Sequence, residues 1–108
     1  MTQAPGSVTV APNVLMSLVA MALREVPGVA RAGIPPRTRS AYRGEGVVLR
    51  LDGAGVGADC YLIAQADTNL LELGIAAQAT VAAVIQELAG MVVREVNIYI
   101  QDVEVASG

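Results

Sequence analysis

The fold is decided by the sequence VVREVNIYIQDVEV at residues 92–105, which alternates apolar and polar residues just after an alanine-rich helical run that ends before Gly90. Alternation with a period of two is typical of a strand that buries one face. The apolar side chains form two sets, Val96, Ile98 and Ile100 on one face and Val103 and Val105 on the other. Because the phase changes around Gln101 and Asp102, the pattern predicts a β-bulge or a change of strand partner there.

The composition indicates one domain with a core of small aliphatic side chains. The 108 residues are 54% apolar, with three Tyr and no Phe or Trp. A chain of this length buries about 65% of the surface that its unfolded form exposes, so it needs no disulfide or metal to fold. We expect a single domain over residues 1–108, with a flexible N-terminus at 1–6, a globular core at 7–105 and a tail at 106–108.

Residues that carry chemistry are scarce. The chain has no His and one Cys, which removes the commonest general base and metal ligand and excludes an internal disulfide. Cys60 lies in an alternating apolar run and is interpreted as a small core residue. Carboxylates such as Asp52 and Asp59 fall near turns, with no Lys or second Cys to form a catalytic pair. The sequence therefore predicts no enzyme activity, no catalytic residue, no cofactor and no metal.

Helical periodicity predicts one helix at 13–26, which starts after Pro12 and stops at Pro27-Gly28, and a second at about 69–89 with a capping box at Asn69 and Glu72. The predicted core positions are Leu15, Leu18, Val19, Ala22 and Val26 in the first helix, and Leu70, Leu73, Ala77, Val81, Val84 and Leu88 in the second. A wider apolar flank on the first helix, at Met16, Ala20, Met21 and Leu23, suggests partial burial by another subunit. The longest apolar helical run is taken as Val14 to Leu23, about half of what a bilayer needs, so no direct membrane insertion is expected.

Strands are predicted at 7–10, 47–52, 59–65 and within 92–105. Residues 30–46 form a long Arg- and Pro-containing loop by composition, and the glycine-rich residues 53–57 form a hairpin turn, because they open a strand and not the helix that a phosphate loop requires. The element order predicts an α+β fold. Its architecture is a two-layer split βαβ sandwich (βαββαβ), in which two helices cover one face of an antiparallel-rich, four-stranded sheet.

Two surfaces are candidate binding sites. The outer face of the second helix is rich in alanine and poor in charge, which indicates either a self-association face or an ordinary solvated face, since alanine is also a strong helix former tolerated on surfaces. The predicted self-association face comprises Ile75, Ala79, Ala82, Ala83 and Gln86, together with Val103 and Val105. The other candidate is an anion- or partner-binding loop with Arg37, Arg39, Tyr42 and Arg43, which alternatively is only a solvated charged loop.

Several segments together resemble the alkaline-shock, or Gls-type, envelope stress response family. They are the opening GSVTVA at 6–11, the helix ending REVPGV at 24–29 and the final strand VREVNIYIQDV at 93–103. The likeness extends from about Gly6 to Val105. It implies a small, non-enzymatic bacterial protein of the cytoplasm. Some members of the family self-assemble and sit near the membrane through a membrane-anchored partner. The chain lacks the charged tail of some members, and its helices contain less Glu and Lys.

The leading hypothesis is therefore a non-enzymatic envelope or alkaline stress response protein, acting as an oligomerising scaffold or protein-interaction module. The alternative is a small RNA-binding module that uses the Arg-rich loop at 37–43. The net charge of −3 makes nucleic acid the less favoured partner.

Overall fold

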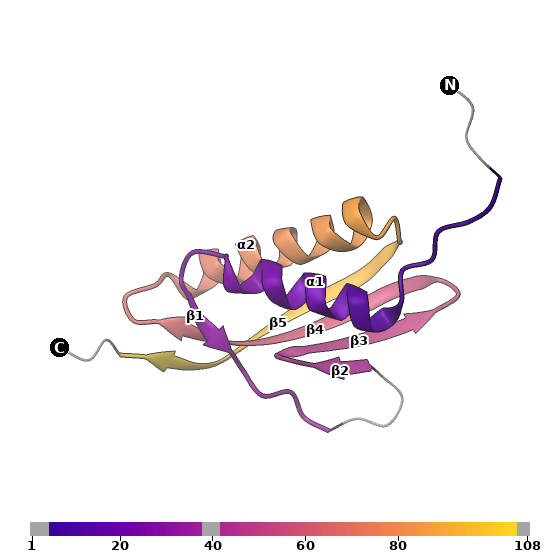
Figure 1. Cartoon of the computed structure of the whole chain (residues 1–108). Coiled ribbons are helices and arrows are strands. Elements are labelled where there is room, and N and C mark those ends of the chain that lie inside the picture. Colours follow the sequence, from indigo (N-terminus) through magenta and orange to yellow (C-terminus); the bar gives the residue numbers. More distant parts are fainter. Residues whose placement is uncertain (1–4, 38–41, 106–108) are drawn as a thin grey trace.

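The computed structural model describes residues 5–37 and 42–105, and in it two helices lie along one side of a single sheet (Figure 1). The elements in chain order are α1 (Pro12–Arg24), β1 (Val29–Ala32), β2 (Tyr42–Gly44), β3 (Val47–Asp52), β4 (Gly55–Gln65), α2 (Leu70–Ala83), the π-helical turn η1 (Val84–Leu88) and β5 (Val93–Glu104). The predicted α+β fold with both helices on one face is confirmed.

Strand β4 organises the sheet. It pairs antiparallel with β3 over Gly55–Cys60 and with β1 over Leu62–Ala64, because its 11 residues extend well beyond the six residues of β3. Strand β2 adds to the outer edge of β3, also antiparallel. On its other side β4 pairs in parallel with β5, which the chain reaches through the crossover that α2 and η1 provide.

Two sequence predictions about strands are wrong. Residues 7–10 form no strand, and Val8 is 95% exposed. The predicted loop at 30–46 instead contains β2 and most of β1, so the sheet has five strands and the observed order is αββββαβ. The physical reason is strand pairing. Val29–Ala32 pairs with the part of β4 that extends beyond β3, whereas residues 7–10 have β propensity but pair with no described strand.

Helix α1 starts at Pro12, whose fixed φ suits a first helical turn. Its buried residues are Leu15, Met16, Val19, Ala20 and Leu23. The sequence suggested that another subunit partly buries the apolar flank of this helix. Three of its four residues, Met16, Ala20 and Leu23, instead belong to the core of this chain, and Met21 is 56% exposed. Leu18 and Ala22, predicted as core positions, are half-buried at its border.

Helix α2 starts as predicted, since the side chain of Asn69 accepts the backbone N–H of Glu72 at 3.0 Å. At its other end the helix widens into η1, where the N–H of Ala89 bonds the carbonyl of Val84, five residues earlier. The extra residue in this turn rotates the following side chains. As a result Ile85 is fully buried and Leu88, a predicted core residue, is 64% exposed.

The predicted phase change in the last strand is confirmed as a bulge. Leu62 pairs with Ile100 and Ile63 with Asp102, which leaves Gln101 as the additional residue. A second irregularity at the start of the strand leaves Arg94 as the additional residue between Val93 and Glu95. The regular part of β5 therefore runs from Glu95 to Ile100.

Candidate functional site

An apolar groove lies between α2 and β5, and we call it the β5 groove. It has a volume of about 250 Å³ and is lined by Leu70, Leu71, Gly74, Ile75, Gln78, Ile98 and Ile100. Leu71 is 74% exposed and Ile75 57%, whereas Ile98 and Ile100 are half-buried against the core. Within residues 5–37 and 42–105, β5 pairs with β4 alone, so the groove runs beside a sheet edge that no other described strand covers.

The helix beside this groove is unusually apolar for a surface element. Leu70–Leu88 has a mean hydropathy of 1.3 and only 28% of it is buried. Its length and composition would suffice to cross a membrane, although core helices of soluble proteins also have this property. The sequence interpretation took Val14–Leu23 as the longest apolar helical run, and the structure shows that Leu70–Leu88 is longer. Its only charged residues are Glu72 and Glu87. A helix with a buried face and an outer face that carries so few charges is typical of an interaction surface.

The predicted self-association positions fall into four groups. Ile75 lines the β5 groove, and Ala79 and Gln86 are exposed elsewhere on the helical segment. Ala82 and Ala83 are only half-exposed. Val103 is 39% exposed and Val105 78%, at the end of β5 beyond the bulge. Of the seven groove residues, the sequence placed only Ile75 on this surface. Leu70, a predicted core residue, is 41% exposed here, and Ile98 and Ile100 were assigned to the buried face. The sequence did not assign the other three, Leu71, Gly74 and Gln78.

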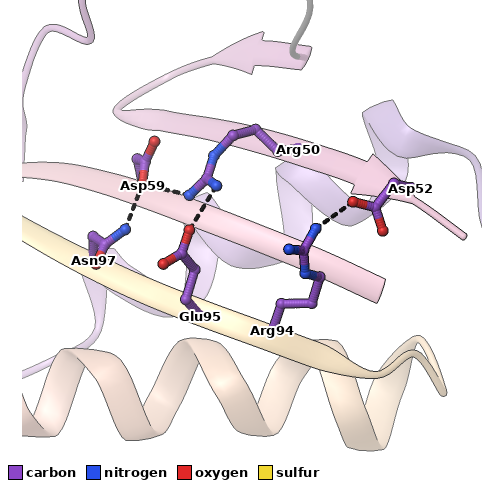
Figure 2. Close-up of polar contacts among 6 residues, drawn as sticks. All are labelled: Arg50, Asp52, Asp59, Arg94, Glu95 and Asn97. Carbon is purple, nitrogen blue, oxygen red and sulfur yellow. Dashed lines mark hydrogen bonds and ion pairs between the residues drawn. The ribbon is translucent and has the colours of Figure 1, made fainter. Parts of the chain in front are cut away.

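The sheet face away from the helices carries a polar network (Figure 2). The guanidinium of Arg50 donates to Glu95 Oε1 at 2.7 Å and to Asp59 Oδ1 at 2.9 Å, and Asn97 Nδ2 donates to the same Asp59 oxygen at 2.9 Å. Arg94 pairs with Asp52 beside it. The hydrogen bond to Glu95, with Asp59 adding to it, raises the pKa of Arg50 above its ordinary value.

Gly57 makes this network possible. Arg50 on β3 reaches Glu95 on β5 by crossing β4, and a Cβ at Gly57 would come within 2.9 Å of the Arg50 guanidinium. The network therefore joins three strands across a position that has no side chain. The network has a structural role, because its charged side chains pair with one another and leave little net charge to attract an ionic ligand.

An aromatic pair continues the same face. Tyr61 and Tyr99 stack with ring centroids 4.8 Å apart and planes inclined by 13°. Burial, with a smaller effect of the Asp59 charge, raises the pKa of Tyr61. Next to this pair the side chain of Gln101 holds the backbone of Ile34, accepting its N–H at 2.8 Å and donating to its carbonyl at 2.9 Å. Gln101, the additional residue of the β5 bulge, thus holds Ile34 in place after the end of β1.

The structure brings together only part of the predicted Arg-rich loop. Arg39 lies outside the described residues. Arg37 is exposed, and Tyr42 and Arg43 are on β2, where Arg43 donates to the carbonyl of Pro35 at 2.7 Å. That bond engages one of the cations proposed to grip a phosphate, and binding by this loop stays a prediction.

Asp59 and Asp52 offer a matched test of the network. Replacing Asp59 by Ala is expected to lower the free energy of unfolding by about 1–2 kcal/mol, because its side chain is 19% exposed and its loss leaves Arg50 and Asn97 without their shared acceptor. Asp52→Ala, at 51% exposure, should cost less than about 1 kcal/mol. Urea unfolding measures both, and equal losses would show that the network adds nothing beyond a surface pair.

Among the described residues, few groups of side chains could hold a metal ion or a substrate. No group of three or more His, Cys, Asp or Glu that could hold a metal ion occurs among residues 5–37 and 42–105. A concavity of about 420 Å³ between α1 and β2 is lined by residues such as Met16 and Met21 and by the exposed pair Arg24 and Glu45, whose charged atoms are 3.6 Å apart.

Comparison with known proteins identifies the family. The sequence model of the alkaline shock protein 23 family, which has a cell envelope-related function, matches residues 1–105. The chain belongs to this family. The resemblance seen in the helix ending and the final strand is therefore confirmed. No curated protein is significantly similar to the chain.

Solved structures similar to this family member share its fold at low sequence identity. MamM CTD, residues 215–293 of that protein, has a TM-score of 0.57 and 17% identity, covering 89% of this chain and 100% of that one. A zinc form of a MamM CTD variant has a TM-score of 0.55 and 16% identity, covering 89% and 87% of the two chains. At these identities the likeness establishes the α+β architecture alone.

Proposed function

We propose that this protein is a non-enzymatic scaffold with a cell envelope-related role, and that it associates with itself through the β5 groove. The single observation that carries the proposal is the exposed apolar surface of Leu71 and Ile75 above Ile98 and Ile100, beside the edge of β5 that faces away from β4. Covering such a surface removes apolar area from water, worth about 25 cal/mol per Å². Membership of a family with a cell envelope-related function supports the role.

A charge placed in the groove is expected to block the association. Ile75→Glu should weaken self-association at least tenfold, because a carboxylate would have to lose its water on binding. Met21→Glu is the matched control, since Met21 is equally exposed, at 56% against 57%, but lies on α1. Light scattering after size exclusion, over a range of concentrations, measures both variants. Equal weakening, or no change in Ile75→Glu, would argue against the groove as the interface.

We further propose that the protein acts in the cytoplasm as a stress response protein and reaches the membrane through an anchored partner. The envelope-related family supports this, and the helix Leu70–Leu88 offers no basic residue to attract anionic headgroups. Affinity capture from the native cell should recover a membrane-anchored protein, and Ile34→Asp and Ile75→Glu variants would show which face it uses. Capture of RNA instead would favour the Arg-rich loop.

A further inference from the structure

We propose that Gly33–Pro36 is a movable strap over the open face of the sheet, the face away from the helices, and that its opening exposes the buried Val48. The strap follows β1 directly, and in Figure 1 the chain runs away from the two helices after that strand. The strap is therefore separate from the β5 groove, and this inference does not depend on the proposed self-association.

The chain leaves the sheet at Gly33 because two strands meet there on one edge of β4. The N–H of Gly33 donates to the carbonyl of Tyr61 at 2.8 Å, and the N–H of Tyr61 donates at 2.7 Å to the carbonyl of Gly46, just before β3. A Cβ at Gly33 would lie 3.0 Å from the carbonyl carbon of Tyr61, so the strap begins in close contact with β4. The residues after Gly33 cannot continue along this edge, since β3 occupies it.

Two side chains from opposite sides of β4 hold the strap. Gln101, the additional residue of the β5 bulge, accepts the N–H of Ile34 at 2.8 Å and donates to its carbonyl at 2.9 Å. Arg43 on β2 donates to the carbonyl of Pro35 at 2.7 Å. Two neighbouring residues of the strap are therefore bonded by strands that lie at different edges of the sheet.

Val48 is the residue that the strap covers. It is directly opposite Arg43 on β2 and Asp59 on β4, so it shares their face, the one that carries the polar network. Val48 is nevertheless only 4% exposed, although both helices lie on the other face of the sheet. Pro35 is buried as well, and its carbonyl is bonded to Arg43, the strand neighbour of Val48. The strap therefore accounts for the burial of Val48.

The strap has few contacts to keep it closed. Pro35 is buried, but Ile34 is 78% exposed and Pro36 is exposed. The two bonds to Gln101 are exposed, so water can replace them when the strap lifts. Such a segment opens locally at a lower free energy than global unfolding, and the fixed φ of two consecutive prolines makes it move as one piece. Its position thus controls whether Val48 is in contact with water.

Thiol labelling in dilute urea tests the cover. In a Cys60→Ala background, Val48→Cys should react with a thiol reagent at least tenfold faster than Val81→Cys, and its rate should change little with urea below the unfolding transition. Val81→Cys is the matched control, because Val81 is fully buried on α2 and should react only through global unfolding, at a rate that rises steeply with urea. The same steep dependence at both positions would overturn the strap as a separately opening unit.

Removing one of the holding side chains should raise the labelling rate. Gln101→Ala deletes both bonds to Ile34, so Val48→Cys should react at least fivefold faster, still with little dependence on urea. Gln78→Ala is the matched control, since it deletes a 3.1 Å bond from another exposed Gln to the backbone of β5, at Val96, and should change the rate less than twofold. An unchanged rate in Gln101→Ala would show that Val48→Cys reacts without any opening of the strap, and would overturn the inference.

Hydrogen exchange shows whether both side chains hold one unit. Arg43→Ala removes only the bond to Pro35, which has no N–H of its own. Because the strap opens as one piece, the amides of Gly33 and Ile34 should both exchange at least threefold faster in this variant, although Arg43 bonds neither of them. Exchange that stays unchanged at both amides would contradict the concerted opening and overturn the strap.

Discussion

Ile85→Ala is expected to lower the free energy of unfolding by about 3 kcal/mol, whereas Leu88→Ala should cost less than about 0.5 kcal/mol. The reason is that the π-helical turn η1 buries Ile85 completely and leaves Leu88 64% exposed. Truncating a buried Ile removes its apolar contacts and leaves a cavity, while truncating an exposed Leu does neither. Urea unfolding of the two variants measures the difference.

This pair of variants tests the helix geometry directly. A regular α-helix continuing the face of Leu73, Ala77 and Val81 would place residues 84 and 88 within the buried face and residue 85 at its edge. A larger loss of stability for Leu88→Ala than for Ile85→Ala would therefore contradict the π-helical turn.

Alkaline pH is expected to destabilise the fold through Cys60. Burial, reinforced by the neighbouring charge of Asp59, raises the pKa of this thiol from 9.0 to about 12. Above pH 9 the unfolded chain releases a proton that the folded chain still holds, so the free energy of unfolding falls as pH rises toward 12. The contribution is about 1.4 kcal/mol per pH unit, and roughly 4 kcal/mol in all. Below pH 9 this contribution is fully present.

Stability measured by urea unfolding from pH 6 to 11 checks the effect. Between about pH 6 and 8 the curve should be nearly flat, because the chain contains no His and no Lys. Cys60→Ala should reduce the alkaline slope by about one proton, whatever it costs in stability at neutral pH. The same slope in both proteins would show that the buried thiol is not responsible.

The sequence predicted the fold where patterns were local. The stop at Pro27-Gly28, the Asn69 cap and the period-two alternation of the last strand each depend on a few neighbouring residues, and α1, α2 and β5 were found from them. The strands Val29–Ala32 and Tyr42–Gly44 were missed because they are three or four residues long and exist only through their partners. Pairing between distant segments gives no local signal.

The candidate site was predicted in part for the same reason. The weakly charged outer face of the second helix predicted a self-association surface, and Ile75 was among its predicted residues. Ile98 and Ile100 were assigned wholly to the core, because alternation reveals which side chains share a face but not how far a helix covers them. That β5 is an edge strand depends on the parallel pairing with β4, which the sequence did not indicate.

Sedimentation equilibrium of the unmodified protein, from micromolar to near-millimolar concentration, tests the central claim that the exposed apolar surface beside β5 is a self-association site. We predict a reversible rise in mass from monomer toward dimer, and a shift of that rise to higher concentration in Ile75→Glu. A wild-type protein that stays monomeric over the whole range would contradict the claim.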